Sequence, residues 1–533
     1  MSLPRSAGRA SRSARFLSRS ARRASRGVLL LAVFLCAACG LVYELALLTL
    51  GDYLAGGGVR ATSVVLGVVV ASMGLGSLAA KAMLRRPLLA FAVVETTLAV
   101  VGGLSVLGLY AAYAWLDLYL PAVLLASVAI GTLIGAEVPL LMALLQQIRT
   151  QEAGAAVADL NAADYLGALV GGLAFPFLLL PVFGQLRGAL VAGTVNLLAA
   201  GLVVGWLRSA GGGPRLPRRT TAALAVLATT GVVVLSGAAA LAEDFEVTAR
   251  QRLYRAPITS AEHSRYQEIV VTRSLPGTPT DLRLFLDGDL QFSSRDEHRY
   301  HEALVQPAMA AGAETVLILG GGDGLALREV LRSAVRRVVE VELDPAVLRL
   351  AREDPALRAL NGDSMRDPRV EVVEADALQW LRGQHERFDV VIVDMPDPDD
   401  AATAKLYSAE FYALAGRLLL PGGRMAVQSG SPYFAAEAFW CVVKTVQSGG
   451  FHVRPYHVDV PSFGDWGFVL AGRGSPPALQ VPKGVTGELR FLDQATLDAA
   501  TVFPRDVRRV PVEPSTLDRP RILDYARRGW QGY

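Results

Sequence analysis

Apolar residues are concentrated in the first half of the chain, where they form long stretches. These stretches cover residues 28–50, 61–84, 88–113, 120–145, 160–183, 187–207 and 220–241. Each has about the 20 residues that an α-helix needs to cross the hydrocarbon core of a bilayer. The pattern predicts a multi-pass α-helical membrane domain of about seven spans over residues 28–242. Residues 1–27 contain eight arginines and no acid, and we expect them to be disordered.

The second half alternates short apolar runs with polar turns. Residues 268–272 and 282–286 are rich in β-forming residues, and Pro276-Gly277 and Asp287-Gly288 are turn signals. They predict a small antiparallel β-sheet in a domain at residues 243–295.

A different pattern of apolar runs begins at residue 316. An apolar run stops at the glycine cluster 320–324 and is followed by a helix-like stretch, which is typical of the first strand, turn and helix of a nucleotide-binding α/β fold. Later apolar runs at residues 336–343, 370–373 and 388–393 also end at or next to acids. Ligands of such folds bind outside the carboxyl ends of the strands. We therefore expect a Rossmann-like, methyltransferase-type domain at residues 296–477, with aligned acids at one edge. A later strand at 423–428 follows a turn at 421–423, and residues 453–460 with 467–471 predict an antiparallel pair at the sheet edge. We expect the polar tail at 478–533 to pack on the domain surface.

Composition sharpens this division. The chain is 52% hydrophobic, with a mean hydropathy of +0.36, and its net charge of +3 is unevenly spread. Residues 1–242 hold 18 lysines and arginines against 8 acids, whereas the remainder holds 34 against 41. An acidic second half argues against nucleic acid as a partner and favours small cations.

Four acids interrupt the apolar stretches: Glu44, Glu95, Glu137 and Asp164. Acids at such positions usually face a helix interface or a polar cavity. Two interpretations remain open, a cavity for a cationic substrate or hydrogen bonding between helices, with small-residue packing. Glycines 67, 74 and 76 would belong to the packing faces.

The cysteines of the first apolar stretch invite a separate interpretation. Cys36 and Cys39 have the spacing of a redox or zinc motif, but their segment lacks polar partners. The sequence therefore argues against such a site there.

A series of short motifs runs through the second half. In order they are Tyr266-Gln267, Leu286-Asp287-Gly288 with Gln291, Asp296-Glu297, Tyr300-His301-Glu302, Gly320-Gly321-Gly322-Asp323-Gly324 with Arg328-Glu329-Val330, Val341-Glu342-Leu343-Asp344, Asp376-Ala377, Asp394 with Asp397-Pro398, Leu406-Tyr407, Gln428, and Pro461 with Phe463. Together they resemble the spermidine synthase, or polyamine aminopropyltransferase, family, and the preceding spans are similar to its membrane-anchored branch. The resemblance implies transfer of an aminopropyl group from decarboxylated S-adenosylmethionine to putrescine, which releases 5'-methylthioadenosine and spermidine.

The chemistry of the residues agrees with this resemblance. The attacking amine must be neutral although an alkylammonium has a pKa of about 10, so a carboxylate base is needed beside it. The sulfonium donor activates its own leaving group, so no metal or cofactor is expected. By resemblance Asp394 is the catalytic base. The resemblance also implies Gln267, Glu342, Asp376, Ala377, Gly320 and Gly322 for the donor, and His301, Asp323, Asp397, Tyr300 and Gln428 for the polyamine.

Three departures from the family pattern leave the acceptor amine open. Met395 and Pro396 replace small hydroxyl residues, and Phe463 stands where a tyrosine is common. The third departure is the membrane half itself, which soluble members lack. A polyamine transporter or sensor without turnover is an alternative, as is a methyltransferase, although methyl transfer needs no clamp for a diamine.

The expected partners are these small molecules, a lipid bilayer and, as one option, further copies of the chain. Lysines and arginines in alternate loops place the N-terminus in the cytoplasm. Seven spans would then place the second half outside, whereas its donor is made in the cytosol. The side on which the enzyme domain lies therefore stays open.

Overall fold

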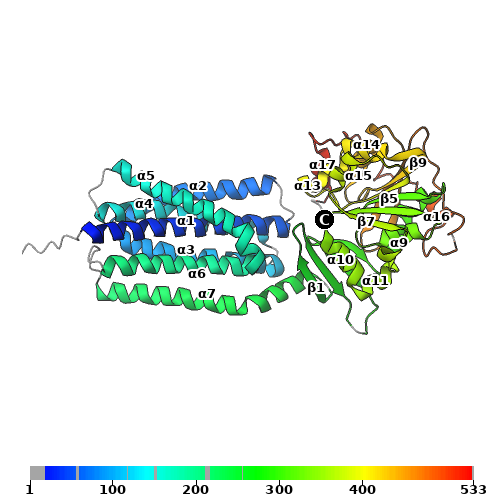
Figure 1. Cartoon of the computed structure of the whole chain (residues 1–533). Helices are drawn as coiled ribbons and strands as arrows, with labels where there is room; N and C mark the ends of the chain where they lie inside the picture. Colours follow the sequence, from blue (N-terminus) through cyan, green and yellow to red (C-terminus); the bar gives the residue numbers. More distant parts are fainter. Residues whose placement is uncertain are drawn as a thin grey trace, which may run out of the picture. The chain divides into compact units, whose positions relative to one another are not determined.

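The computed structural model describes residues 19–530, except for 56–58, 117, 149–152, 210–216, 255, 276 and 486. The chain divides into two compact units, Met1–Leu253 and Tyr254–Tyr533. The first unit is helical, and the second combines helices with two β-sheets (Figure 1). Residues 1–18 of the segment expected to be disordered lie outside the described residues, while 19–27 are helical.

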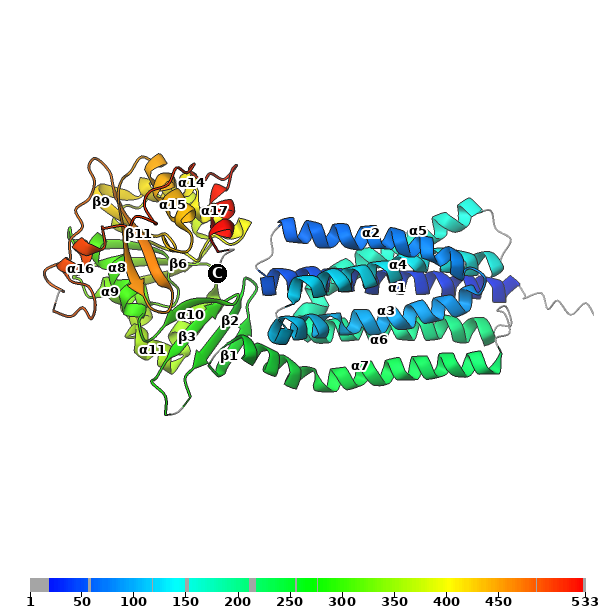
Figure 2. The same cartoon turned by 180° about the vertical axis from the view of Figure 1, so that it is seen from behind.

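Long helices that run side by side make up the first unit (Figures 1 and 2). They are α1 (Arg19–Ala55), α2 (Val59–Met83), α3 (Pro87–Ala111), η1 (Ala112–Leu116), α4 (Tyr119–Ile148), α5 (Ala153–Ala174), η2 (Phe175–Leu179), α6 (Leu180–Ser209) and α7 (Arg218–Leu253). Among the described residues, six stretches are long and apolar enough to cross a membrane. The fifth and sixth predicted stretches lie in one of these, Val157–Trp206, which is interrupted by the non-helical Gly184. The count of seven spans stays a prediction.

Glycines let several of these helices approach closely. A Cβ atom on Gly76 of α2 would lie 1.9 Å from the carbonyl oxygen of Thr132 in α4, and one on Gly167 of α5 would lie 2.1 Å from that of Phe34 in α1. Small residues allow such contacts between apolar helices. The expected packing role is confirmed for Gly76 and wrong for Gly67 and Gly74, whose Cβ positions have no neighbour within 4 Å.

The second unit opens with the predicted antiparallel sheet. It contains β1 (Ile258–His263), β2 (Glu268–Arg273), β3 (Leu282–Leu286) and β4 (Asp289–Ser293), paired in sequence order. Asp287 and Gly288 join β3 to β4 with positive φ angles of 50° and 93°. An Asp-Gly pair favours this two-residue hairpin turn because both positions need left-handed backbone.

The second sheet has seven strands, in the order β10-β11-β9-β8-β5-β6-β7. They are β5 (Thr315–Gly320), β6 (Arg337–Glu342), β7 (Val370–Glu374), β8 (Phe388–Asp394), β9 (Leu419–Gln428), β10 (His452–Val460) and β11 (Gly464–Gly472). The strands β5 to β9 run parallel, and β10 and β11 form the antiparallel pair expected at the edge. The turn predicted at 421–423 lies inside β9, because Leu419 already pairs with Phe388 and the register shifts after it.

Helices cover both faces of this sheet (Figures 1 and 2). One core contains side chains of α8 (Glu297–Met309), α9 (Leu325–Leu331), α10 (Pro345–Glu353) and α11 (Pro355–Asn361). The opposite core contains side chains of α12 (Ala377–Gly383), α14 (Ala409–Arg417), α15 (Ala436–Ser448) and α17 (Arg521–Trp530). Both faces are therefore buried, which suits strands as continuously apolar as β5.

The tail is part of these cores and does not merely lie on the surface, as the sequence suggested. Leu497 belongs to the first core and Ile522 to the second. Glu302, completely buried in α8, accepts hydrogen bonds of 2.8–3.0 Å from the backbone N–H groups of residues 490–492. Glu302 therefore holds the tail against α8 through these hydrogen bonds.

Candidate functional site

The site is built where the strand order reverses. From β5 the chain proceeds outward to β6 and β7 on one side, and then to β8 and β9 on the other. The carboxyl ends of β5 and β8 are neighbours, with Gly320 paired to Asp394. Gly320 has a φ of 81°, and a Cβ atom on it would lie 2.0 Å from the Asp394 carbonyl oxygen. Ligands of open α/β sheets bind at such a reversal, so both predicted residues lie where a ligand is expected.

The loop after β5 presents Asp323. Its carboxylate accepts a 2.8 Å hydrogen bond from the Leu325 N–H, and its backbone carbonyl accepts one of 3.0 Å from Asn361. Burial raises the pKa of Asp323 to about 6, although the charge of His301 opposes the rise. Asp323 is thus a carboxyl group that a nearby cation would ionise fully at neutral pH.

Asp394 ends β8 beside this loop. Tyr300 of α8 donates a 2.6 Å hydrogen bond from its hydroxyl group to Asp394 Oδ1. Burial raises the pKa of Asp394 above its usual value, while the charge of His301 and the hydrogen bond from Tyr300 oppose the rise. A buried carboxylate with a raised pKa is a stronger proton acceptor than an exposed one.

His301 lies next to Tyr300 in a buried chain of charges. Its Nδ1 is 2.8 Å from the Glu297 carbonyl oxygen and 3.1 Å from Glu297 Oε2, and Arg328 donates to both Glu297 carboxylate oxygens. Burial alone would lower the pKa of His301, but the hydrogen bond and charge of Glu297, with Asp323 and Asp394, raise it to about 9. His301 is therefore an imidazolium at neutral pH, and its charge favours the ionised forms of the two aspartates.

The turn after β8 carries Asp397. Gln428 at the end of β9 donates a 3.1 Å hydrogen bond to Asp397 Oδ1 and a 2.7 Å bond to the Met395 carbonyl oxygen. Tyr407 of η4 (Lys405–Tyr407) donates to the Pro396 carbonyl oxygen at 2.9 Å and accepts from Gln428 at 2.5 Å. Burial and the charge of Asp399 raise the pKa of Asp397 to about 7. The neighbouring strand thus fixes the turn in place.

Glu342 ends β6 on the other side of the glycine loop. A Cβ atom on Gly322 would lie 2.7 Å from Glu342 Cγ, so only glycine lets the loop pass this side chain. Burial raises the pKa of Glu342 to about 7, against hydrogen bonds from the backbone N–H groups of Asp344 and Leu343.

Gln267 lies at the same edge, between β1 and β2. Its amide donates a 3.0 Å hydrogen bond to Asp344 Oδ2, which also accepts a 2.6 Å bond from Ser264. Asp344 in turn caps α10 by accepting from the Ala346 N–H. The small sheet therefore supplies side chains to the edge formed by β5 and β6.

Asp376 lies beyond β7, at the start of α12. It accepts hydrogen bonds from the Gln379 N–H at 3.0 Å and from Lys405 Nζ at 2.7 Å, and Ala377 next to it is buried. Burial by itself raises the pKa of Asp376, but the bonds from Lys405 and the helix backbone lower it below its usual value overall. The acid is both a helix cap and part of an ion pair, unlike Asp394.

Two acids near Asp397 were not predicted as site residues. Burial and the neighbouring charges of Asp399 and Asp397 raise the pKa of Asp289 to about 7, and burial also raises the pKa of Asp399. Asp289 follows the Asp287-Gly288 turn, where an acid is ordinary turn chemistry. Its approach to Asp399 is a tertiary contact that no local pattern indicates.

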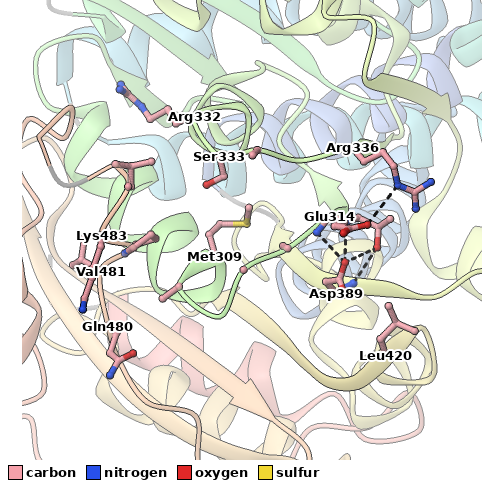
Figure 3. A pocket seen from close by; sticks show the side chains of 18 of the residues that line it. Met309, Glu314, Arg332, Ser333, Arg336, Asp389, Leu420, Gln480, Val481 and Lys483 are labelled. Carbon is pink, nitrogen blue, oxygen red and sulfur yellow. Dashed lines mark hydrogen bonds and ion pairs between the residues drawn. The ribbon is translucent and has the colours of Figure 1, made fainter.

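A large groove lies at the opposite edge of the sheet (Figure 3). It has a volume of about 1660 Å³, and its lining includes Met309, Thr315, Arg332, Asp389 and Lys483. Thr315 begins β5, whereas the site described above lies at the end of that strand. The groove is therefore separate from the aspartates that the sequence singled out.

The arrangement can hold a cation. Within the part of the chain that the structure describes, no lysine or arginine forms an ion pair with Asp323, Asp394 or Asp397. The His301 imidazolium offsets part of the charge of Asp323 and Asp394, but desolvating three carboxylates beside one cation is still unfavourable, so a positively charged ligand would stabilise all three. Asp394 would additionally accept a proton from such a ligand.

Known proteins resemble this chain over different lengths. A crystal structure of spermidine synthase from Thermotoga maritima covers 47% of this chain and 86% of its own, with 27% identity and a TM-score of 0.43. The spermine/spermidine synthase domain matches residues 297–476.

Full-length relatives are more similar. Polyamine aminopropyltransferase 1 of Streptomyces coelicolor is 57% identical over 96% of both chains. Polyamine aminopropyltransferase of Mycobacterium tuberculosis is 52% identical over 95% of this chain and 97% of its own. At this identity and coverage the chain belongs to the polyamine aminopropyltransferase family.

Proposed function

We propose that the chain transfers an aminopropyl group from decarboxylated S-adenosylmethionine to putrescine, giving spermidine and 5'-methylthioadenosine. The observation that carries this proposal is the edge formed by Asp323, Asp394 and Asp397, three partly exposed but desolvated carboxyl groups that have no lysine or arginine partner among the described residues. Both substrates are cations at neutral pH, so the edge complements each of them. The names of the relatives support the same reaction class.

The reaction needs one proton acceptor and no covalent intermediate. The amine nitrogen attacks the methylene carbon next to the sulfonium, and a C–N bond forms as the C–S bond breaks. The electron pair of that bond remains on sulfur, so methylthioadenosine leaves as a neutral thioether. Asp394 accepts the proton that the amine must lose, and Tyr300 orients the carboxylate through its 2.6 Å hydrogen bond.

The donor occupies the part of the site that lies nearest to β6. Glu342 accepts hydrogen bonds from the ribose hydroxyl groups, while Gly320 and Gly322 let the donor approach the backbone. Asp323 pairs with the ammonium group of the aminopropyl chain. Gln267 lines the donor site from the small sheet.

The adenine lies near the start of α12. Asp376 accepts from the adenine amino group, beside Ala377. Because Lys405 and the Gln379 N–H already donate to this carboxylate, its remaining lone pairs have to serve the adenine.

The acceptor amine occupies the side nearest β9. Asp397 holds an ammonium group, and Gln428 keeps that carboxylate in place. Tyr300 lines the amine site, with its ring centroid 6.0 Å from that of Phe463. His301 borders the amine site, where its positive charge keeps Asp394 and Asp323 ionised and does not bind the amine directly.

Product analysis tests this function. The full chain, solubilised in detergent, is incubated with decarboxylated S-adenosylmethionine and putrescine. Spermidine and methylthioadenosine should form in equal amounts, and neither should form when S-adenosylmethionine replaces its decarboxylated form. A silent enzyme under these conditions would overturn the proposal, and methyl transfer would identify a methyltransferase.

The helical unit is proposed to anchor the enzyme in the cell membrane as a multi-pass domain. Its support is the six long apolar stretches in the described residues. The N-terminus is placed in the cytoplasm by the loop charges, and association between copies stays a prediction. A reporter fused after residue 533 and active on only one side of the membrane would fix the side of the enzyme domain; absence from the membrane fraction would contradict the anchor.

A further inference from the structure

The interior of the helical unit contains a group of polar side chains that aminopropyl transfer does not use. Cys36 of α1, Glu95 of α3 and Glu137 of α4 are buried, with exposed fractions of 1%, 0% and 4%. One thiol sulfur and one carboxylate oxygen from each acid lie within 4.8 Å of one another. The sequence suggested that Cys36 lacked polar partners; the fold brings two from other helices, so that reason for dismissing a metal site is wrong.

Other polar groups around this cluster also lack partners. Both carboxylate oxygens of Glu95 and the Oε1 atom of Glu137 make no hydrogen bond of normal geometry within the described residues, although Cys36, Glu137 and Asn196 all lie near Glu95. Asn196 of α6 lies beside Glu95 and is completely buried, yet neither of its amide atoms has a hydrogen bond of normal geometry. Buried polar groups are almost always satisfied, because an unpaired one costs several kcal/mol in an apolar interior. Three helices, α3, α4 and α6, thus place unsatisfied groups near the Cys36 thiol of α1.

We propose that Cys36, Glu95 and Glu137 bind a divalent transition-metal ion of the zinc class, with the Asn196 carbonyl oxygen as a fourth ligand. Sulfur and carboxylate oxygens bind Zn²⁺ at about 2.3 Å and 2.0–2.2 Å, so donors this close together can share one ion after a small adjustment. A thiol among the ligands favours zinc-like ions over Mg²⁺ or Ca²⁺. An alkylammonium fits less well, because sulfur is a weak hydrogen-bond acceptor.

Such an ion would be structural. It would connect α1, α3, α4 and α6, which pack against one another around α1, and its charge would be neutralised by two anionic ligands within the apolar bundle. Binding would release one proton from the thiol and one from the pair of carboxyl groups, which leaves the other carboxyl group protonated. Cys39, also buried in α1, is not part of the group, which makes it a matched control.

Cobalt substitution tests the site. The full chain without a histidine tag, purified in detergent, is stripped with a chelator and titrated with Co²⁺. We expect one equivalent to bind with thiolate-to-cobalt charge-transfer absorption, and Zn²⁺ to displace it. Cys36→Ser should abolish the absorption and Cys39→Ser should retain it, while aminopropyl transfer by both variants reports folding of the catalytic half.

Three outcomes would overturn the proposal. They are a wild-type protein that neither retains a metal nor shows cobalt absorption, absorption that survives Cys36→Ser, and displacement of cobalt by putrescine. If Cys36→Ser does not fold, Glu137→Gln replaces it, since this variant keeps the side-chain shape and should weaken Co²⁺ binding at least tenfold by titration.

Discussion

The strand β8 carries an aspartate near each end, and the two have opposite environments. Asp389, near the start, is partly exposed and accepts hydrogen bonds of 2.9–3.0 Å from the Thr315 N–H, the Thr315 hydroxyl and the Glu314 N–H (Figure 3). Burial favours a higher pKa for Asp389, but these bonds lower it below its usual value overall. Asp394, at the end, is also partly exposed but accepts one hydrogen bond, from Tyr300, and desolvation raises its pKa.

The contrast extends to the two ends of the parallel strands, which we call the amino edge, where the strands begin, and the carboxyl edge, where they end. At the amino edge, Arg337 pairs with Glu371 and Glu386, and Arg336 lies 3.7 Å from Glu314. At the carboxyl edge, Asp323 and Asp397 have raised pKa values because they are buried. Acids therefore occur at both edges, and what distinguishes Asp323, Asp394 and Asp397 from Glu314, Glu371 and Glu386 is that no lysine or arginine among the described residues pairs with them. The presence of an acid at the end of a strand is therefore not enough to identify the reactive site.

The most direct test of this comparison is to remove one charge at each end of β8. Asp394→Asn should lower kcat by about 10²- to 10⁴-fold, the range for loss of a general base. Asp389→Asn should leave kcat unchanged and lower stability by about 1 kcal/mol through weaker hydrogen bonds. Steady-state kinetics with putrescine and thermal unfolding measure both. Equal losses of kcat in the two variants would show that the position of Asp394 has no special role.

Two glycines with similar positive φ angles, one at each edge, provide a second test. Gly320 and Gly422 have φ angles of 81° and 82°, but only at Gly320 would a Cβ atom meet a neighbour, the Asp394 carbonyl oxygen at 2.0 Å. Gly422→Ala should cost about 1–2 kcal/mol from left-handed strain alone. Gly320→Ala should cost more and displace Asp394, with loss of activity. Unfolding midpoints of the two variants compare these costs; a larger loss for Gly422→Ala would contradict the close approach.

Acidification should weaken the carboxyl edge before the amino edge. A cationic substrate binds the ionised carboxylates, so affinity is present above their pKa values, about 7 for Asp397 and about 6 for Asp323, and is lost as pH falls through them. Between pH 8 and pH 6 the ionised fraction of a group with a pKa of 7 falls from about 0.9 to about 0.1, so the KM for putrescine should rise about tenfold. Asp397→Asn should flatten this dependence, and an unchanged profile in that variant would assign it to another group.

Much of the α/β half could be predicted from local patterns. The apolar runs that became β5 to β8, the small antiparallel sheet and the edge pair were all expected, because burial on both faces leaves a strong signal. The alignment of acids at one edge followed from the rule that strand ends face ligands. The tail was wrongly placed, since the partners of Glu302 are backbone groups that carry no residue signature.

Tertiary contacts account for most of what the sequence could not provide. Nothing local indicates that Asp289 meets Asp399, or that Glu95 and Glu137 meet Cys36. The glycines of α2 also differ from one another, because only Gly76 faces α4 closely. Residue type predicts the chemistry that is available, while the neighbours decide which groups are left unsatisfied.

The smallest expected effect concerns Asp289 at the border of the amine site. It lies beside Asp399, whose own pKa burial raises, so the two carboxyl groups do not both ionise readily at neutral pH. A polyamine bound at Asp397 would bring positive charge towards them. Asp289→Asn should raise the KM for the amine about two- to fivefold with little change in kcat, because a partly solvated charge contributes about 1 kcal/mol or less.

Glu386→Gln is the matched change at the amino edge, where the carboxylate pairs with Arg337 on the surface. It should leave the KM within experimental error, since exposed ion pairs contribute little and are screened by salt. Competition between putrescine and spermidine extends the test, because an extra carboxyl pair favours the longer, more highly charged amine. If Asp289→Asn changes neither KM nor this preference, the additional acids do not belong to the amine site, and the functional edge ends at Asp397.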